Sequence, residues 1–115
     1  MKLPNFEHAT IPKAKITEYL LSATHRDGRS KALFFTRYGF STDAWRVLAQ
    51  ALQNHAADNE VAKVEDSPFG KRYIVEGAML APDGRTASIR SVWFVNEGES
   101  IPKFVTAYPL QRRLK

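Results

Sequence analysis

The sequence has no cysteine and no long hydrophobic run. Without cysteine the protein has no disulfide framework, no thiolate nucleophile and no cysteine-ligated zinc or iron–sulfur site. Its apolar runs are only a few residues long, far below the roughly 20 residues that a membrane-spanning helix needs. The segment 1–7 also lacks the apolar core of a secretory signal peptide. We therefore expect a cytoplasmic protein with no membrane partner.

Several catalytic motifs are absent as well. The chain contains no Gly-x-Gly-x-x-Gly, Walker loop, His-Glu-x-x-His or Gly-x-Ser-x-Gly. Its 3 histidines are far apart and its carboxylates are dispersed, so no group of residues has metal-ligand spacing. The sequence accordingly predicts no metal and no cofactor.

What the sequence does have is the length of one domain and an excess of positive charge. A chain of 115 residues can bury a core of its own without metal or disulfides. Lys and Arg number 17 against 12 Asp and Glu, which gives a formal charge of +5. This charge favours an anionic partner, of which nucleic acid is the commonest, although a soluble surface that is simply basic explains it equally well.

The first half of the chain, about residues 12–58, has the periodicity of helices. Gly39 follows the second helix and suits a C-terminal position with positive φ. Trp45 begins the buried stripe of the third helix, and His55 near its end is expected to be structural, as a cation that complements the helix dipole. The predicted helices cover residues 12–22, 31–38 and 42–57.

The second half, about residues 60–109, has the patterns of β-strands separated by short turns. Short connections require antiparallel neighbours, because a parallel crossover needs about a dozen residues. The prediction is an α+β fold in which three N-terminal helices precede a four-stranded antiparallel meander with the helices on one face. A single domain then spans residues 1–115 and ends in a basic tail at 110–115. The predicted strands cover residues 61–65, 73–80, 86–95 and 103–108.

Side chains alternate across a strand, so each of the last two strands divides into two faces. Arg90 stands in mid-strand among hydroxyl-bearing neighbours, and an arginine can grip a phosphate through two hydrogen bonds. An ordinary solvated face explains the same pattern, since β-branched and aromatic residues are good strand formers. The face predicted to lie under the helices carries Ile89, Trp93, Val95, Val105 and Ala107. The opposite face carries Ser88, Arg90, Thr106 and Tyr108.

A second basic cluster lies in the loop before the second helix. Gly28 is free to take a positive φ there, and Ser30 is expected to cap the helix. The free N–H groups of such a helix start attract anions, and Arg29 and Lys31 add positive charge. Histidine is the side chain suited to proton exchange near neutral pH, so His25 is a candidate to exchange a proton during catalysis. A helix-connecting loop with solvated charges is the alternative.

Short motifs in order along nearly the whole chain point to a family: Leu20-Leu21, His25, Gly28–Ala32, Phe35, Gly39-Phe40, Gly84–Thr86, Arg90–Trp93 and Val105–Pro109. Together they resemble a family of small bacterial domains of unknown function, which occur alone or at the ends of toxin and phage proteins. These domains are similar to the broader barnase/EndoU/colicin/RelE-like ribonuclease superfamily. The superfamily fold has helices followed by a four-stranded antiparallel sheet.

The resemblance implies metal-independent RNA cleavage, in which the ribose 2′-OH attacks the adjacent phosphate and leaves a 2′,3′-cyclic phosphate. The chemistry needs a base, cationic donors and an acid. No carboxylate occupies an obvious position for the general base. The identity of the base therefore stays open between His25, a lysine and no residue at all. The catalytic candidates are His25, Arg90, Thr106 and Tyr108. The substrate-binding candidates are Arg29, Lys31, Arg85 and Ser88.

The partners that the resemblance implies are RNA, either tRNA or mRNA, and an acidic antitoxin or immunity protein. Two alternatives stay open, namely a non-catalytic nucleic-acid-binding module and a toxin–antitoxin protein-interaction module. The nuclease hypothesis depends on one placement, in which the imidazole of His25 and the guanidinium of Arg90 meet at one pocket. A separation above about 15 Å would exclude it, because proton transfer needs hydrogen-bond reach or one bridging water.

Overall fold

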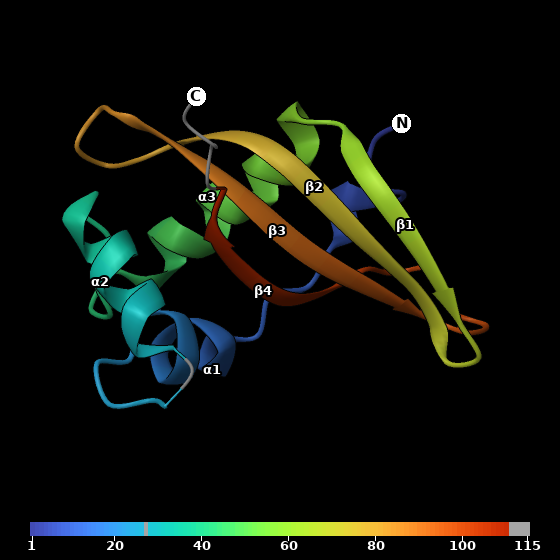
Figure 1. Cartoon of the computed structure of the whole chain (residues 1–115), viewed down its shortest axis with the longest axis horizontal. Coiled ribbons are helices and arrows are strands. Elements are labelled where there is room, and N and C mark those ends of the chain that lie inside the picture. Colours follow the sequence, from blue (N-terminus) through green and yellow to red (C-terminus); the bar gives the residue numbers. More distant parts are fainter. Residues whose placement is uncertain (27, 111–115) are drawn as a thin grey trace, which may run out of the picture.

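The computed structural model describes residues 1–26 and 28–110, so residues 111–115 of the predicted basic tail lie outside the described residues. Its α+β architecture agrees with the sequence prediction, since helices precede a four-stranded antiparallel meander in one compact domain (Figure 1). No helix in the described part of the chain is long and apolar enough to cross a membrane. The elements are η1 (Phe6–His8), α1 (Lys13–Lys15), η2 (Ile16–Leu20), α2 (Arg29–Arg37), α3 (Trp45–Asp58), β1 (Val61–Ser67), β2 (Gly70–Leu80), β3 (Thr86–Asn96) and β4 (Lys103–Pro109).

The sheet runs in the order β1-β2-β3-β4, with every neighbouring pair antiparallel. Helix α3 crosses behind the sheet in Figure 1, while α1 and α2 lie beyond its β4 side. The N-terminal segment protects the β4 edge, because Thr10 exchanges backbone hydrogen bonds with Pro102 and Phe104 at 2.9 Å each. One face of the sheet therefore carries α3, and we call the opposite one the outer face.

The core lies between α3 and the inner face of β2 and β3. The helical stripe is buried as predicted, with Leu48, Leu52 and Ala56 each 0% exposed. Trp93 on β3 is also 0% exposed, and its ring meets that of Phe104 edge-on at 5.4 Å. This packing fixes which side of each strand faces the helix.

The predicted face assignment is wrong at one pair of residues in β4. Trp93 is opposite Phe104 whereas its neighbour Val92 is opposite Thr106, so Val105 is an extra residue at a β-bulge. A bulge shifts the alternation of side chains by one position. Phe104, 2% exposed, consequently takes the core position that simple alternation assigns to Val105.

The start of α2 also differs from the prediction. The helix begins at Arg29 with Gly28 as its N-cap residue, so Ser30 is not the cap. Gly28 has φ −93°, which any residue can adopt, and the expected positive φ is wrong. Glycine is nevertheless required, because a Cβ there would lie 2.0 Å from the carbonyl oxygen of Tyr19. Gly39 has the predicted positive φ, 97°.

His55 is structural, as predicted, but not as an exposed cation. It is 1% exposed, and its Nδ1 lies 3.0 Å from the Ser91 hydroxyl while its Nε2 lies 3.2 Å from the Gly77 carbonyl oxygen. A carbonyl only accepts, so Nε2 carries the proton and Nδ1 accepts from Ser91. The Trp93 indole N–H donates to the same hydroxyl at 2.8 Å. Burial lowers the pKa of His55, so the imidazole is neutral.

Candidate functional site

Arg90 lies on the outer face of the sheet between a carboxylate and a phenol. Antiparallel pairing places Glu76 of β2 opposite it on one side and Tyr108 of β4 on the other. The guanidinium donates from Nε and Nη2 to one carboxylate oxygen, Oε2 of Glu76, at 2.7 and 2.5 Å. Its Nη1 reaches the Tyr108 hydroxyl at 3.5 Å, and the guanidinium carbon lies 5.7 Å from that ring's centroid. Three adjacent strands thus hold one cation in a fixed orientation.

The Arg90–Glu76 pair is only partly shielded from solvent. The two side chains are 34% and 30% exposed. The hydrogen bonds that Arg90 donates to Tyr108 and then to Glu76 raise the pKa of Arg90 above its usual value, so it remains charged. Within the described residues, the hydrogen bonds to the Glu76 carboxylate all end on Oε2, which leaves Oε1 able to accept a proton or a ligand hydroxyl.

A cavity opens beside this row of residues. It has a volume of about 330 Å³ and is lined by Arg90, Tyr108, Pro109 and Leu110. The phenol of Tyr108 and the guanidinium of Arg90 give it a polar wall, while Pro109 and Leu110 give it an apolar one. A cavity with a cation on one side suits an anionic group that carries an apolar or aromatic substituent.

Tyr19 joins the basic loop to the sheet. Its hydroxyl makes a 2.9 Å hydrogen bond with the hydroxyl of Thr106, and its ring meets that of His25 edge-on at 5.0 Å. The ammonium groups of Lys31 and Lys15 lie 5.4 and 5.6 Å from the centroid of the same ring. The ring of Tyr19 therefore contacts the loop histidine and two lysines beside strand β4.

The backbone of the loop sets the protonation pattern of His25. The Gly28 amide donates to Nδ1 at 3.1 Å, so the neutral imidazole carries its proton on Nε2. Gly28 can occupy this position only because it has no Cβ, which would clash with the carbonyl oxygen of Tyr19. The same glycine that opens α2 thus orients the histidine.

The structure brings several of the predicted site residues together along β3 and β4 and places Arg85 apart from them. Thr106 and Tyr108 are two residues apart on the same strand, so the Tyr19 contact and the Arg90 contact lie side by side along β4. Ser88 is two residues from Arg90, and its carbonyl accepts from the Leu110 amide at 2.9 Å. Arg29, the first residue of α2, is exposed.

Arg85 is the separated residue, at the β2–β3 turn. It is paired with Asp83, whose pKa it lowers, and its Nη2 donates to the Arg37 carbonyl at 2.7 Å. Its guanidinium also lies 4.4 Å from the centroid of the Tyr38 ring. These contacts tie the turn to the end of α2 and leave Arg85 outside the group around Arg90.

Two residues of the site were missed by the sequence analysis. Glu76 could have been found by counting outward from the β2–β3 turn, because the pair Leu80–Thr86 leads in four steps to Glu76–Arg90. Tyr19 gave a weaker signal, since it lies inside the first predicted helix, residues 12–22, where no motif singles it out. Its hydroxyl group was the one clue that it also makes a polar contact.

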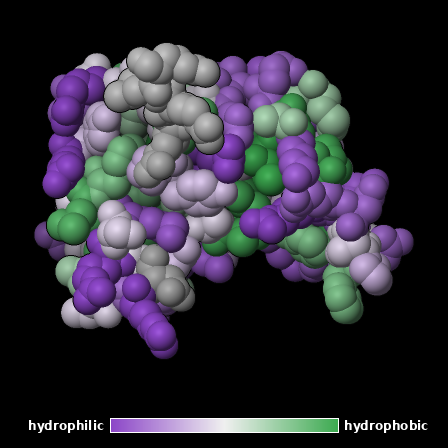
Figure 2. Space-filling view, viewed as in Figure 1, coloured by the Kyte–Doolittle hydropathy of each residue, from purple (hydrophilic) through white to green (hydrophobic). Residues whose placement is uncertain are grey.

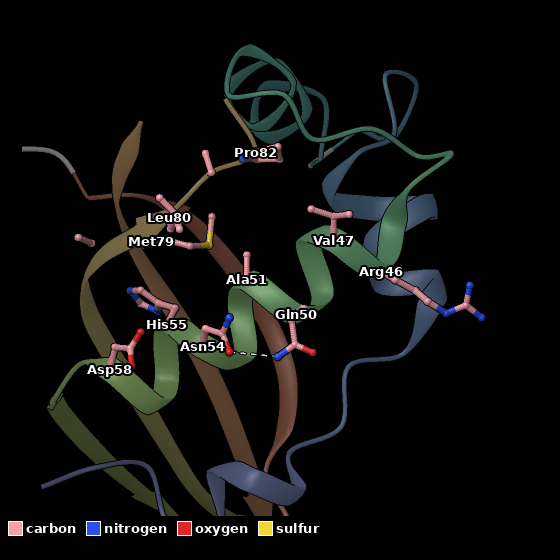
Figure 3. Close-up of a pocket in the computed structure, with 12 residues that line it drawn as sticks. Arg46, Val47, Gln50, Ala51, Asn54, His55, Asp58, Met79, Leu80 and Pro82 are labelled. Atoms are coloured by element: carbon pink, nitrogen blue, oxygen red, sulfur yellow. Dashed lines mark hydrogen bonds between the residues drawn. The ribbon is translucent and has the colours of Figure 1, made fainter. Parts of the chain in front are cut away.

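A larger cavity, of about 600 Å³, lies between α3 and the end of β2 (Figure 3). Arg46, Gln50, Asn54 and Asp58 line its α3 side, and Leu80 and Pro82 line the other. It contains none of the site residues predicted from the sequence. In the described part of the chain, no group of three or more His, Cys, Asp or Glu is arranged to hold a metal ion.

The chain belongs to the domain of unknown function DUF6883, whose family it matches over residues 2–111. No curated protein matches it. Its fold is similar to that of a chain in the contact-dependent growth inhibition toxin–immunity protein complex from Klebsiella pneumoniae 342. That similarity has a TM-score of 0.72 and 22% sequence identity, and covers 89% of this chain and 100% of the other. At this identity the likeness shows a shared fold.

Proposed function

We propose that this protein is a toxin-type endoribonuclease whose reactive centre is the row Glu76–Arg90–Tyr108. The observation that carries the proposal is a partly exposed charged pair fixed on the outer face of the sheet, with a cavity beside it and a histidine-bearing loop next to strand β4. An ionised carboxylate, a guanidinium and an imidazole are the groups that metal-independent transesterification needs. The sequence motifs that resemble toxin-associated domains support the same class.

In the proposed reaction, Glu76 is the base. Its Oε1 takes the proton of the ribose 2′-OH while the 2′-oxygen forms a bond to phosphorus. Arg90, already anchored on Oε2, turns its remaining donors toward the phosphate oxygens on which negative charge grows. The Tyr108 hydroxyl donates to the same oxygens.

Departure of the 5′-oxygen completes the step. For this step His25 takes up a proton on Nδ1 and releases the Gly28 amide, which gives an imidazolium. The bond from phosphorus to the 5′-oxygen breaks, and the leaving oxygen takes a proton from Nε2 of that imidazolium, so the products are a 2′,3′-cyclic phosphate and a free 5′-OH. Tyr19 holds the imidazole beside Thr106, and Lys31 adds positive charge at this side. No metal takes part in this scheme.

The partner that we propose is an acidic immunity protein or antitoxin that covers the basic site. The formal charge of +5 favours association with an acidic surface. The similar chain from Klebsiella comes from a toxin–immunity protein complex, which supports the proposal of such a pairing. A stoichiometric acidic protein that co-purifies and blocks RNA cleavage would support it.

The test is incubation of the purified protein with labelled total RNA, with and without EDTA, followed by analysis of the product ends. We expect EDTA-insensitive cleavage that leaves cyclic phosphate, and its abolition by Glu76→Gln and by Arg90→Ala. Arg46→Ala is the matched control, because Arg46 is an exposed arginine on α3, outside this site. RNA that stays intact, or cleavage that survives both site variants, would contradict the proposal.

A second candidate function is RNA binding without cleavage. The specific observation in its favour is that Arg90 is already paired with Glu76 at 2.5 Å, an arrangement that can be structural. This candidate predicts RNA that is retarded in a gel but remains intact, with an affinity that falls steeply as salt rises.

A further inference from the structure

Phe94 is a large aromatic residue on the outer face that the proposed reaction does not use. It pairs with Arg72 of β2 on one side and Lys103 of β4 on the other, so two cations flank the ring across the sheet. Phe94 is half-buried and does not belong to the hydrophobic core cluster. Its neighbours in sequence, Trp93 and Val95, face the core instead.

The two flanking cations are held weakly. Arg72 reaches Glu65 at 3.6 Å and Lys103 reaches Glu99 at 3.5 Å, and the two basic side chains are 46% and 52% exposed. Arg90, by contrast, is bound to Glu76 at 2.5 Å. Exposed, loosely paired charges of this kind add little to stability, so both can turn toward a phosphate at small cost.

The position of Phe94 relative to Arg90 suits a polymer that crosses the sheet. The two residues are four positions apart on β3, on the same face, which corresponds to about 13 Å along a strand. Stacked nucleotides are about 3.4 Å apart along one strand, so this distance spans at most about four of them, and fewer where the bases are unstacked. In Figure 2 hydrophobic and hydrophilic surface alternate across this side of the molecule.

We propose that Phe94, with Arg72 and Lys103, is a nucleobase-binding subsite for single-stranded RNA. The ring stacks on a base within about four nucleotides of the phosphate at Arg90, and the two cations contact the phosphates around that base. Aromatic rings beside cations are the usual means by which proteins bind single-stranded nucleic acid. The inference rests on the proposed function, because the strand must be RNA that also reaches Arg90.

The test is binding rather than cleavage. A fluorescently labelled, single-stranded RNA octamer with 2′-O-methyl groups lacks the attacking hydroxyl, so it reports affinity independently of chemistry. Phe94→Leu, which keeps an apolar side chain, should weaken binding about 5- to 150-fold, the loss expected for one stacked base. Phe94→Tyr, which keeps an aromatic ring, should bind the octamer with an affinity close to that of the wild type. Phe69→Leu is the control, because Phe69 is 77% exposed at the β1–β2 turn. Thermal unfolding of each variant checks that the sheet is intact.

A direct signature of stacking comes from Phe94→Trp. Its added indole fluorescence should be quenched by the octamer, whereas that of Phe69→Trp should not. Equal affinity of the wild type and Phe94→Leu, or no binding of the octamer by the wild type, would overturn this subsite. The nuclease proposal is judged separately, by cleavage of total RNA: binding that depends on Phe94 without cleavage leaves the subsite standing and removes the nuclease.

Discussion

Strand β3 carries two polar clusters that face opposite sides of the same sheet, at adjacent residues. Ser91 faces inward, where it joins His55 and the Trp93 indole, and Ser91 and His55 are at most 1% exposed. Arg90 faces outward, where it joins Glu76 and Tyr108 with about a third of its side chain exposed. Both clusters are well hydrogen-bonded, and what separates them is access to solvent and to a ligand.

The inner cluster resembles a structural network because its polar atoms hydrogen-bond to one another and to the backbone inside the core. Among the described residues, no buried side-chain polar atom lacks a hydrogen-bond partner. Such networks specify one arrangement of a core and leave no group for a reaction. The outer cluster keeps one carboxylate oxygen and part of a guanidinium available, which is the condition for chemistry.

The largest expected effect is on activity at the outer cluster. Glu76→Gln should reduce RNA cleavage by about 100-fold or more, because the amide cannot serve as the base. The free energy of unfolding should change by about 1 kcal/mol or less, since the pair is partly exposed. Initial rates on a defined RNA and denaturant melts measure the two quantities. A variant that loses activity only because it is unfolded would contradict the assignment.

Ser91→Ala should have the opposite effect, with a large loss of stability and little change in RNA cleavage. Its removal leaves the indole N–H of Trp93 and Nδ1 of His55 unsatisfied in the core, which should cost about 1–3 kcal/mol for each unsatisfied group. Cleavage per folded molecule should stay close to that of the wild type. Denaturant unfolding and rates measured well below the melting temperature test this. A loss of rate with unchanged stability would show that the inner cluster takes part in the reaction.

Acid should act on the inner cluster through His55. Burial lowers its pKa in the folded protein, so below about pH 6.5 the unfolded chain binds a proton that the folded one does not. The contribution of His55 to stability is therefore complete above that pH and is lost as the pH falls toward its folded pKa. The loss is at most about 1.4 kcal/mol per pH unit. Melts from pH 7.5 to 5 should show it, and a His55→Gln variant should lack this part of the slope.

The smallest effect is expected where the loop meets the sheet. Tyr19→Phe removes one hydroxyl and the hydrogen bond to Thr106 but keeps the ring beside His25. Stability should fall by about 0.5–1.5 kcal/mol, with only a few-fold loss of cleavage. A double-mutant cycle with Thr106→Val measures the coupling between the two hydroxyls. Strictly additive effects would show that this contact does not join the two parts of the site.

Much of the fold was predictable because it depends on local patterns. Turn residues such as those around Gly84 and Gly98 divide the second half into strands, and short connections leave only antiparallel pairing. The failures came from contacts between distant residues. The bulge at Val105 puts Phe104 in the core position that alternation assigns to Val105. Gly28 is required by the carbonyl of Tyr19 rather than by its own φ.

The same distinction applies to the candidate site. Arg90 and Tyr108 were identified from their alternation along single strands, which is a local property. Glu76 was overlooked because its importance comes from the residue opposite it on the next strand. Arg85 was included for its charge, and only the structure assigns its contacts to Asp83 and Tyr38.

The amino-acid order alone determined the class of fold, the order of the elements and, outside the bulge in β4, the two faces of β3 and β4, since periodicity and turn chemistry act over a few residues. Tertiary structure alone decided which charges are paired, which histidine is buried and which loop lies beside β4. Those outcomes depend on distances between residues as far apart as Tyr19 and Thr106, where a hydrogen bond needs the whole chain to be folded before its two atoms can meet.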